Sequence, residues 1–188
     1  MRASGLQQGA AARIEAEYTR SAFRWREGRL VLAKMAAPLD IRWSRPPPAG
    51  AEPSTVTVSR DPAGRWHVAI LADTSVAHHA PVTTAIGVDA GVSTLLTLPT
   101  GEKITNPRHE RRDRARLATA QRRLARKQMG SNNRAKARLR IARIHARIAD
   151  RRRDHLHKLS TRLVRENQTI VIEDLSVRTM VRNHRLAR

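Results

Sequence analysis

The pattern of apolar and polar positions divides the chain into a strand-like first half and a helix-like second half. From Phe23 onward, short apolar runs alternate with turn residues. Strict alternation over 54–59 and 66–72, joined by "DPAG", predicts a β-hairpin. After a polar connection, "TAIGVD", "VSTLLTL" and "EKIT" predict a meander of three antiparallel strands. Residues 1–22 are poorly defined, and their weakly periodic stretch "AARIEAEYTR" could be a frayed helix or the tail of an upstream segment.

Helical periodicity dominates the second half. Asn106-Pro107 predicts a helix start, with an N-cap residue followed by proline at the first helical position. Apolar residues recur at helical spacing on both sides of a break at Gly130, which predicts two antiparallel helices over about 107–167. The second, roughly 133–167, is expected to be about 50 Å long with a narrow apolar stripe. The run "QTIVIEDL" has the form of a buried parallel strand, and the basic tail after it is expected to be partly helical.

The order of these elements predicts the fold class α+β. A small β-rich module over 23–80 is followed by a mixed domain over 81–188, in which three strands precede the helical hairpin and one strand follows it. A ribonuclease-H-like sheet requires this order. In such a sheet the fourth strand lies parallel beside the first, since crossover connections are right-handed.

The charge of the chain is concentrated in the predicted helices. There are 37 Lys and Arg against 16 Asp and Glu, a formal net charge of +21, and residues 107–167 hold 21 basic and 5 acidic side chains. A merely solvated face is the alternative, but so dense a charge favours contact with nucleic-acid phosphates. The predicted nucleic-acid-binding residues are Arg111, Arg112, Arg122, Arg123, Arg126, Lys127, Arg134, Lys136, Arg138, Arg140, Arg143, Arg147, Arg151, Arg152 and Arg153.

Composition excludes several classes of protein and site. The chain has no cysteine, so disulfides and thiolate metal sites are excluded, while hard cations held by oxygen stay possible. No window of about 18 apolar residues predicts a membrane span, and no signal pattern predicts secretion. We therefore expect a cytoplasmic, nucleoid-associated protein with DNA or RNA as partner and no membrane contact. The histidines are assigned no metal.

Two acids carry the candidate chemistry. Asp89 ends the first strand of the predicted sheet and Glu173 ends the fourth, so both are expected at one sheet edge although 84 positions separate them. Two ionised carboxylates about 4 Å apart repel by roughly 4 kcal/mol at an effective dielectric constant near 20, and a cation relieves this repulsion. Mg²⁺ or Mn²⁺ at such a pair is typical of two-metal phosphodiester cleavage. Asp89 and Glu173 are therefore the predicted catalytic and metal-binding residues.

Other interpretations of these acids stay open. An aspartate before Ala-Gly is often a turn residue that accepts hydrogen bonds from nearby backbone N–H groups. Glu173 and Asp174 could cap the next helix, a role that is favoured for Asp174. The stretch "IGVDAG" also resembles the first phosphate motif of actin-like ATPases, although no second glycine-rich phosphate loop follows. Both acids in this strand order, together with the basic hairpin, favour a nuclease.

Several longer motifs then suggest a family. The segments "IGVDAGV", "TGEKITNPRHERR", "AQRRLARKQMGSNNRAKARLRIARIHARIADRRRDHLHKLST" and "IVIEDLSVRTMVRNHRLAR", with "IRWSRPPPAGAEPSTVTVSRDPAGRWHV" upstream, resemble the OrfB/TnpB proteins of bacterial insertion sequences. These are called transposases and are related to type V CRISPR effector nucleases. The resemblance covers about residues 22–188.

This resemblance implies a wedge-like β module followed by a RuvC-type nuclease domain with a long basic helical hairpin insertion. It implies that a transposon-derived guide RNA directs the protein to DNA by base pairing. Asp89 matches the first catalytic acid of the family and Glu173 the second. The complete family enzyme is expected to use Mg²⁺ or Mn²⁺.

The sequence also departs from the family pattern. Family members continue past "VRNHRLAR" with a four-cysteine zinc ribbon and a third catalytic aspartate, and most of the N-terminal recognition region has no counterpart here. The resemblance therefore implies an incomplete RuvC domain that does not cleave DNA by itself. The alternatives are a noncatalytic DNA- or RNA-binding remnant and, more weakly, an actin-like ATPase fragment.

Overall fold

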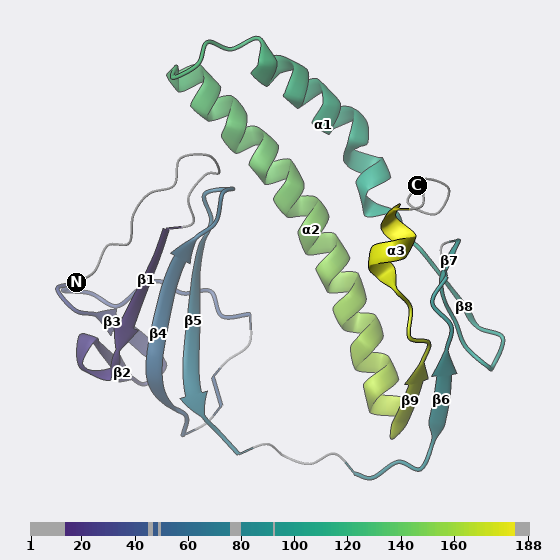
Figure 1. Cartoon of the computed structure of the whole chain (residues 1–188). Coiled ribbons are helices and arrows are strands. Elements are labelled where there is room, and N and C mark those ends of the chain that lie inside the picture. Colours follow the sequence, from purple (N-terminus) through teal and green to yellow (C-terminus); the bar gives the residue numbers. More distant parts are fainter. Residues whose placement is uncertain (1–13, 45–46, 49, 76–79, 92, 183–188) are drawn as a thin grey trace. The chain divides into compact units, whose positions relative to one another are not determined.

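The computed structural model describes residues 14–44, 47–48, 50–75, 80–91 and 93–182 (Figure 1). Within these ranges the chain is a mixed α+β protein, as the element order predicts, with two long helices and several small sheets. Its contacts group the chain into two units, Met1–His78 with Thr119–Ala146 and His79–Ala118 with Arg147–Arg188. The expectations for residues 1–13 and for the end of the basic tail, 183–188, lie outside the described residues.

A three-stranded antiparallel sheet dominates the β-rich part of the first unit. Its order is β1 (Ile14–Thr19), β4 (Glu52–Arg60) and β5 (Trp66–Asp73). The predicted hairpin is confirmed as β4 and β5, with Arg60 opposite Trp66 in register. Gly64 in the connecting turn has a φ of +82°, which glycine adopts without steric cost.

Strand β1 replaces the frayed helix that the local pattern suggested. All six of its residues pair with β4, from Ile14 opposite Arg60 to Thr19 opposite Thr55. The helix prediction was wrong because it rested on local periodicity, whereas the strand is defined by hydrogen bonds to residues about 40 positions away. Tyr18 of this strand also packs against the hydrophobic core of the β-rich part.

A tight hairpin completes that core. Strands β2 (Phe23–Arg26) and β3 (Arg29–Leu32) follow the short 3-10 helix η1 (Arg20–Ala22) and are joined by Glu27 and Gly28, both at positive φ. Two consecutive positive φ values are typical of the turn that matches the twist of a two-residue hairpin. Four buried side chains form the core, namely Phe23, Leu30, Leu32 and Val56.

The second unit contains the predicted parallel pair. Strand β6 (Ala85–Val88) pairs in parallel with β9 (Thr169–Ile172), in register from Ala85 opposite Thr169 to Val88 opposite Ile172. Strands β7 (Thr94–Thr97) and β8 (Lys103–Thr105) form an antiparallel pair. The expected three-stranded meander forms only in part. Strand β7 pairs with β8, but β6 is linked to β7 only by a single bridge between Asp89 and Thr97.

Strand β9 is parallel but it is not buried. Val171 is 61% exposed and Ile172 is 71% exposed, so the expectation of a buried strand was wrong. The apolar run was interpreted as a strand covered on both faces. Within the described residues, only Ile170 of β9 packs against the local core, which consists of Val88, Leu98 and Leu163 with partly buried neighbours.

Two long helices follow β8. They are α1 (His109–Ala125) and α2 (Asn132–Glu166), which run antiparallel (Figure 1). Helix α1 begins three residues after the predicted cap, because the Asn106 side chain accepts a hydrogen bond from Arg108 N, at 3.0 Å, in a turn that precedes the helix. Ser131 caps α2 by accepting a hydrogen bond from Arg134 N at 3.2 Å. A short helix, α3 (Val177–Arg182), follows β9.

None of the helices in the described ranges is long and apolar enough to cross a membrane.

Candidate functional site

The structure places Asp89 and Glu173 at equivalent positions on adjacent strands. Val88 is the last paired residue of β6 and Ile172 the last of β9, and these two residues are register partners. Strands β6 and β9 lie side by side (Figure 1). Asp89 and Glu173 each follow directly, so both acids leave the carboxyl ends of parallel strands at one sheet edge. Both side chains are exposed to solvent. Residues 84 positions apart in the sequence are therefore neighbours in the fold.

The backbone of Asp89 is held in place while its carboxylate is not. Asp89 N donates to Thr97 O at 3.1 Å, and Thr97 N donates to Asp89 O at 2.9 Å. Gly91 N donates to Leu95 O at 3.3 Å, and a Cβ at Gly91 would lie 2.8 Å from Thr94 O, so only glycine fits this close approach. Across the described residues, the Asp89 carboxylate accepts no hydrogen bond and forms no ion pair. This finding argues against the interpretation of Asp89 as a turn-stabilising residue.

The acids after β9 do not cap the following helix in the described part of the chain. Ser176 directly precedes α3, and its hydroxyl lies 2.8 Å from the hydroxyl of Thr179. Thr179 N also donates to Ser176 O at 3.0 Å. The capping role expected for Asp174 was therefore wrong. Glu173 and Asp174 are both exposed, and neither side chain has a hydrogen-bond or ion-pair partner among the described residues.

The donor set at this edge suits a hard divalent cation. Mg²⁺ prefers oxygen ligands, and it is commonly bound by one or two carboxylates while water and substrate phosphates complete its shell. Asp89 and Glu173 supply two exposed carboxylates at adjacent strand ends. No group of three or more metal-ligating side chains occurs among the described residues. Asp89 and Glu173 do not form a closed structural metal site, and an ion that they held would need further oxygen ligands to complete its shell.

The predicted nucleic-acid-binding residues lie on α1 and α2 or in the turn between them. Thirteen of the fifteen are exposed, and Arg134 and Arg151 are partly buried. Fixed cations on a helix surface attract phosphates without the cost of desolvating buried charges. The exposed thirteen therefore form a surface that can bind a polyanion.

The two partly buried arginines make contacts within the protein. Arg134 donates to the carbonyl oxygens of Leu124, at 3.3 Å, and Lys127, at 2.9 Å, at the end of α1. Arg151 binds Asp113 at 2.8 Å, which links α2 to α1. Asp113 is 4% exposed, so this carboxylate depends on its partner for charge compensation. In the structure these two guanidinium groups thus stabilise the hairpin.

A contact between two histidines was not predicted from the sequence. The rings of His109 on α1 and His155 on α2 lie edge to face with centroids 5.9 Å apart. Their positions are 46 residues apart, and spacing along one helix could not reveal the contact. The Nε2 atoms of both rings are buried and have no hydrogen-bond partner.

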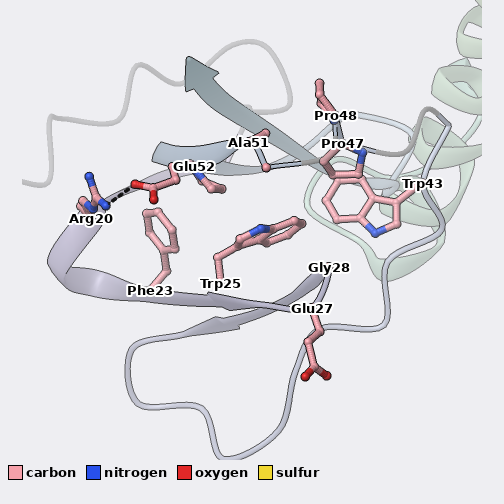
Figure 2. Close-up of a pocket in the computed structure, with 12 residues that line it drawn as sticks. Arg20, Phe23, Trp25, Glu27, Gly28, Trp43, Pro47, Pro48, Ala51 and Glu52 are labelled. Atoms are coloured by element: carbon pink, nitrogen blue, oxygen red, sulfur yellow. Dashed lines mark hydrogen bonds and ion pairs between the residues drawn. The ribbon is translucent and has the colours of Figure 1, made fainter. Parts of the chain in front are cut away.

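Aromatic side chains line a hollow in the β-rich part (Figure 2). It encloses about 850 Å³, and Phe23, Trp25 and Trp43 line it. The two tryptophan rings meet edge to face at 5.8 Å. At one end, Arg20 and Glu52 form an ion pair of 2.6 Å, so this cation is already neutralised. The hollow is therefore a poor site for phosphates.

Comparison with known proteins places the chain in a family. The model of the family OrfB_IS605, described as "Probable transposase", matches residues 57–184, more than half of the chain. The chain belongs to the OrfB_IS605 family. The matched range includes the end of β4, all of β5, the parallel strand pair with its two acids and both long helices.

Three curated relatives of this OrfB_IS605 protein share one description. A "Putative RNA-guided DNA endonuclease" of Streptomyces pristinaespiralis is 67% identical over 177 residues, which cover 94% of this chain and 44% of the relative. InsQ of Escherichia coli K12, with the same description, is 39% identical over 66% of this chain and 31% of the relative. A Mycobacterium tuberculosis relative with this description is 33% identical over 52% of this chain and 22% of its own. The chain thus spans less than half the length of these relatives.

Proposed function

We propose that this chain carries two metal-binding carboxylates and part of the nucleic-acid surface of an RNA-guided DNA endonuclease with a ribonuclease-H-like, RuvC-type catalytic domain. The observation that supports this most directly is the register of β6 and β9, which brings Asp89 and Glu173 to adjacent strand ends. The names of the relatives support the class of reaction. DNA and a transposon-derived guide RNA are the proposed partners.

In this proposal Asp89 and Glu173 are the residues that would hold a Mg²⁺ or Mn²⁺ ion. The bound ion supplies Lewis-acid stabilisation for the attacking and leaving oxygens of phosphodiester hydrolysis. Asp89 and Glu173 would provide ligand oxygens from two adjacent strand ends. The ion in turn relieves the repulsion between the two carboxylates. The backbone hydrogen bonds of Asp89 fix the strand end from which its carboxylate extends.

The exposed cations of α1 and α2 hold nucleic-acid backbones. Guide RNA supplies sequence recognition by pairing, so the protein needs contacts to phosphates rather than to base edges. If the surface neutralises about 6–10 phosphates, affinity should fall about 10³–10⁵-fold between 50 and 200 mM salt.

A chimaera provides the test of cleavage. In it, this chain replaces the matching segment of the Streptomyces pristinaespiralis relative, and cleavage of guide-complementary DNA is measured with Mg²⁺. We expect Asp89→Asn and Glu173→Gln each to lower the cleavage rate by at least about a hundredfold, because each removes a ligand of the ion. The matched control is Asp174→Asn, a neighbouring exposed acid with no proposed role, which should cleave like the parent. Undiminished cutting by Asp89→Asn would refute the assignment.

The runner-up is a noncatalytic nucleic-acid-binding protein that uses the same exposed cations. It predicts salt-sensitive RNA binding that Asp89→Asn leaves unchanged, without metal-dependent cleavage by the chimaera. An actin-like ATPase fragment would instead show ATP binding by the 188-residue chain, which an equilibrium dialysis measurement detects.

A further inference from the structure

A hollow in the second unit gathers basic side chains from both long helices. It encloses about 370 Å³ between the first turns of α1 and the middle of α2, with Leu95 of β7 in its wall. Four arginines line it, namely Arg108, Arg111, Arg114 and Arg152, with His109 and His155 beside them. Arg108 and Arg114 are not among the residues that the charge pattern singled out.

The charges in this hollow are not compensated within the described structure. None of the four guanidinium groups forms an ion pair or a side-chain hydrogen bond with another described residue. Glu110 is the one acid in the lining, against four permanent cations. Arg151, one position before Arg152, shows the contrast, because its guanidinium binds the buried Asp113. The hollow therefore has an excess of positive charge available to a ligand.

The histidine pair adds unsatisfied polar atoms. The Nε2 atoms of His109 and His155 are buried without a hydrogen-bond partner, although buried polar atoms in folded proteins nearly always have one. Each ring lines the hollow. The two imidazole rings and four guanidinium groups thus line one hollow, and the guanidinium groups are donors for oxygen atoms that carry negative charge.

We propose that this hollow binds a backbone phosphate of the single DNA strand that enters the carboxylate site. Phosphate is favoured over a metal ion, because the four guanidinium groups repel cations and no group of three metal ligands exists among the described residues. Arginine forks match the geometry of phosphate oxygens in pairs. The hollow therefore binds an anion of this geometry.

A hydrogen bond connects the hollow to the carboxylate edge. Leu95 lies in the wall of the hollow, and its carbonyl oxygen accepts a hydrogen bond from Gly91, two residues after Asp89. A strand whose phosphate is held here is thus positioned beside the loop that follows Asp89. This inference rests on the proposed function, because it assigns the phosphate to the substrate DNA strand.

The first experiment measures binding of the full 188-residue chain to a fluorescent single-stranded oligo-dT in EDTA, by anisotropy between 50 and 200 mM salt. We expect Arg114→Gln/Arg152→Gln to weaken binding about tenfold or more and to reduce the slope of log affinity against log salt by about one to two. The charge-matched control is Arg24→Gln/Arg29→Gln, on exposed residues of the β2–β3 hairpin. Equal losses in the two double variants would overturn the proposal, since they would indicate only a nonspecific charge effect.

The second experiment locates the ligand by NMR of the histidine ring protons. Adding a five-nucleotide oligo-dT should shift the Hε1 signals of His109 and His155, assigned through His109→Gln and His155→Gln, and leave His67 unmoved. Absence of these shifts, or shifts with an RNA oligonucleotide but not with DNA, would contradict the DNA assignment. Shifts with inorganic phosphate but not with oligo-dT would indicate a site for a free anion and would also overturn it.

The two proposals can fail separately. Binding is measured without a divalent ion, so an inactive chimaera does not affect its outcome. Conversely, a chimaera that cuts DNA through Asp89 while its Arg114→Gln/Arg152→Gln variant cuts equally well retains the proposed function and excludes the phosphate site.

Discussion

The β-rich part of the first unit and the parallel strand pair of the second bury their apolar residues very differently. Leu30 and Val56 in the former are completely buried, at 0% exposure. In the latter, Val171 and Ile172 of β9 expose 61% and 71% of their surface. Both regions have strands rich in β-branched and aliphatic residues, so composition does not explain the contrast. The difference arises because the hairpin β2–β3 packs against the antiparallel sheet and covers its apolar residues. In contrast, β9 contributes only Ile170 to its local core.

The two regions therefore differ in role: the first contributes more to stability, and the second contains the candidate site. The closed core stabilises the first region through buried area, to which each fully buried aliphatic side chain contributes about 1.5–3 kcal/mol. The strand pair of the second region has less burial, but its open end presents two acids to solvent. In the proposed function, the carboxylates must be exposed so that a phosphodiester substrate can approach them.

Among the changes that test this contrast, Leu30→Ala should have the largest effect on the free energy of unfolding. Loss of a fully buried leucine should destabilise the β-rich part by about 3 kcal/mol, through lost burial and a residual cavity. All three tryptophans, Trp25, Trp43 and Trp66, lie in this part, so urea unfolding followed by tryptophan fluorescence reports on it. The exposed neighbour Arg29→Ala serves as control and should shift the transition by less than about 0.5 kcal/mol. An unchanged fluorescence midpoint in Leu30→Ala would show that this core does not limit stability.

Lowering the pH should have a smaller effect on stability, through the titration of Asp61 in the β4–β5 turn. Burial raises the pKa of Asp61, but hydrogen bonds from the backbone and side chain of Arg65 and from His67 outweigh it and lower the pKa from 3.8 to about 2. A depressed pKa in the folded state contributes stability above the unfolded pKa, and this stability is lost as the pH falls from about 4 to about 2. We expect a loss on the order of 1 kcal/mol, visible in the same fluorescence transition.

The control for this titration is Asp61→Asn, which should be less stable at pH 7 and show a flatter pH dependence between 4 and 2. The backbone hydrogen bond from Arg65 N to Asp61, at 2.9 Å, can persist with an amide oxygen, so the turn itself should form. If both proteins lose stability equally over this range, other carboxylates determine the acid response.

The smallest effect is expected from Ile172→Thr. This side chain is 71% exposed and threonine keeps its β-branch, so the change should alter stability by less than about 0.5 kcal/mol. Its register partner Val88 is 8% exposed, and Val88→Thr should cost about 1–2 kcal/mol because it buries a hydroxyl group. Thermal unfolding followed by circular dichroism compares the pair. A large loss in Ile172→Thr would indicate that a further contact covers β9 in solution.

Local patterns predicted those elements whose partners lie near in sequence. The alternation in β4 and β5 and the turn at Asp61 indicated their pairing, since a short connection leaves little choice of register. The helical hairpin was predicted from spacing, although α1 begins at His109 because the Asn106 side chain organises a separate turn. The parallel pairing of β6 and β9 was predicted from element order and the handedness of crossovers.

Features that depend on distant residues were missed. The local pattern of β1 suggested a helix, and only its pairing with β4 makes it a strand. The burial of β9 was overestimated, because an apolar run does not reveal whether another layer covers it. At the candidate site, the positions of Asp89 and Glu173 followed from topology. The contact between His109 and His155 could not be predicted, since it depends on how the two helices are aligned across the hairpin.

The bridge between Asp89 and Thr97 has an evolutionary consequence. It involves only peptide groups, so residues other than proline at position 89 can form the same two hydrogen bonds. Mutation can exchange this acid without rebuilding the scaffold around it. If Asp89 holds a metal ion as proposed, a single codon change would remove that ligand and leave the path of the backbone unchanged.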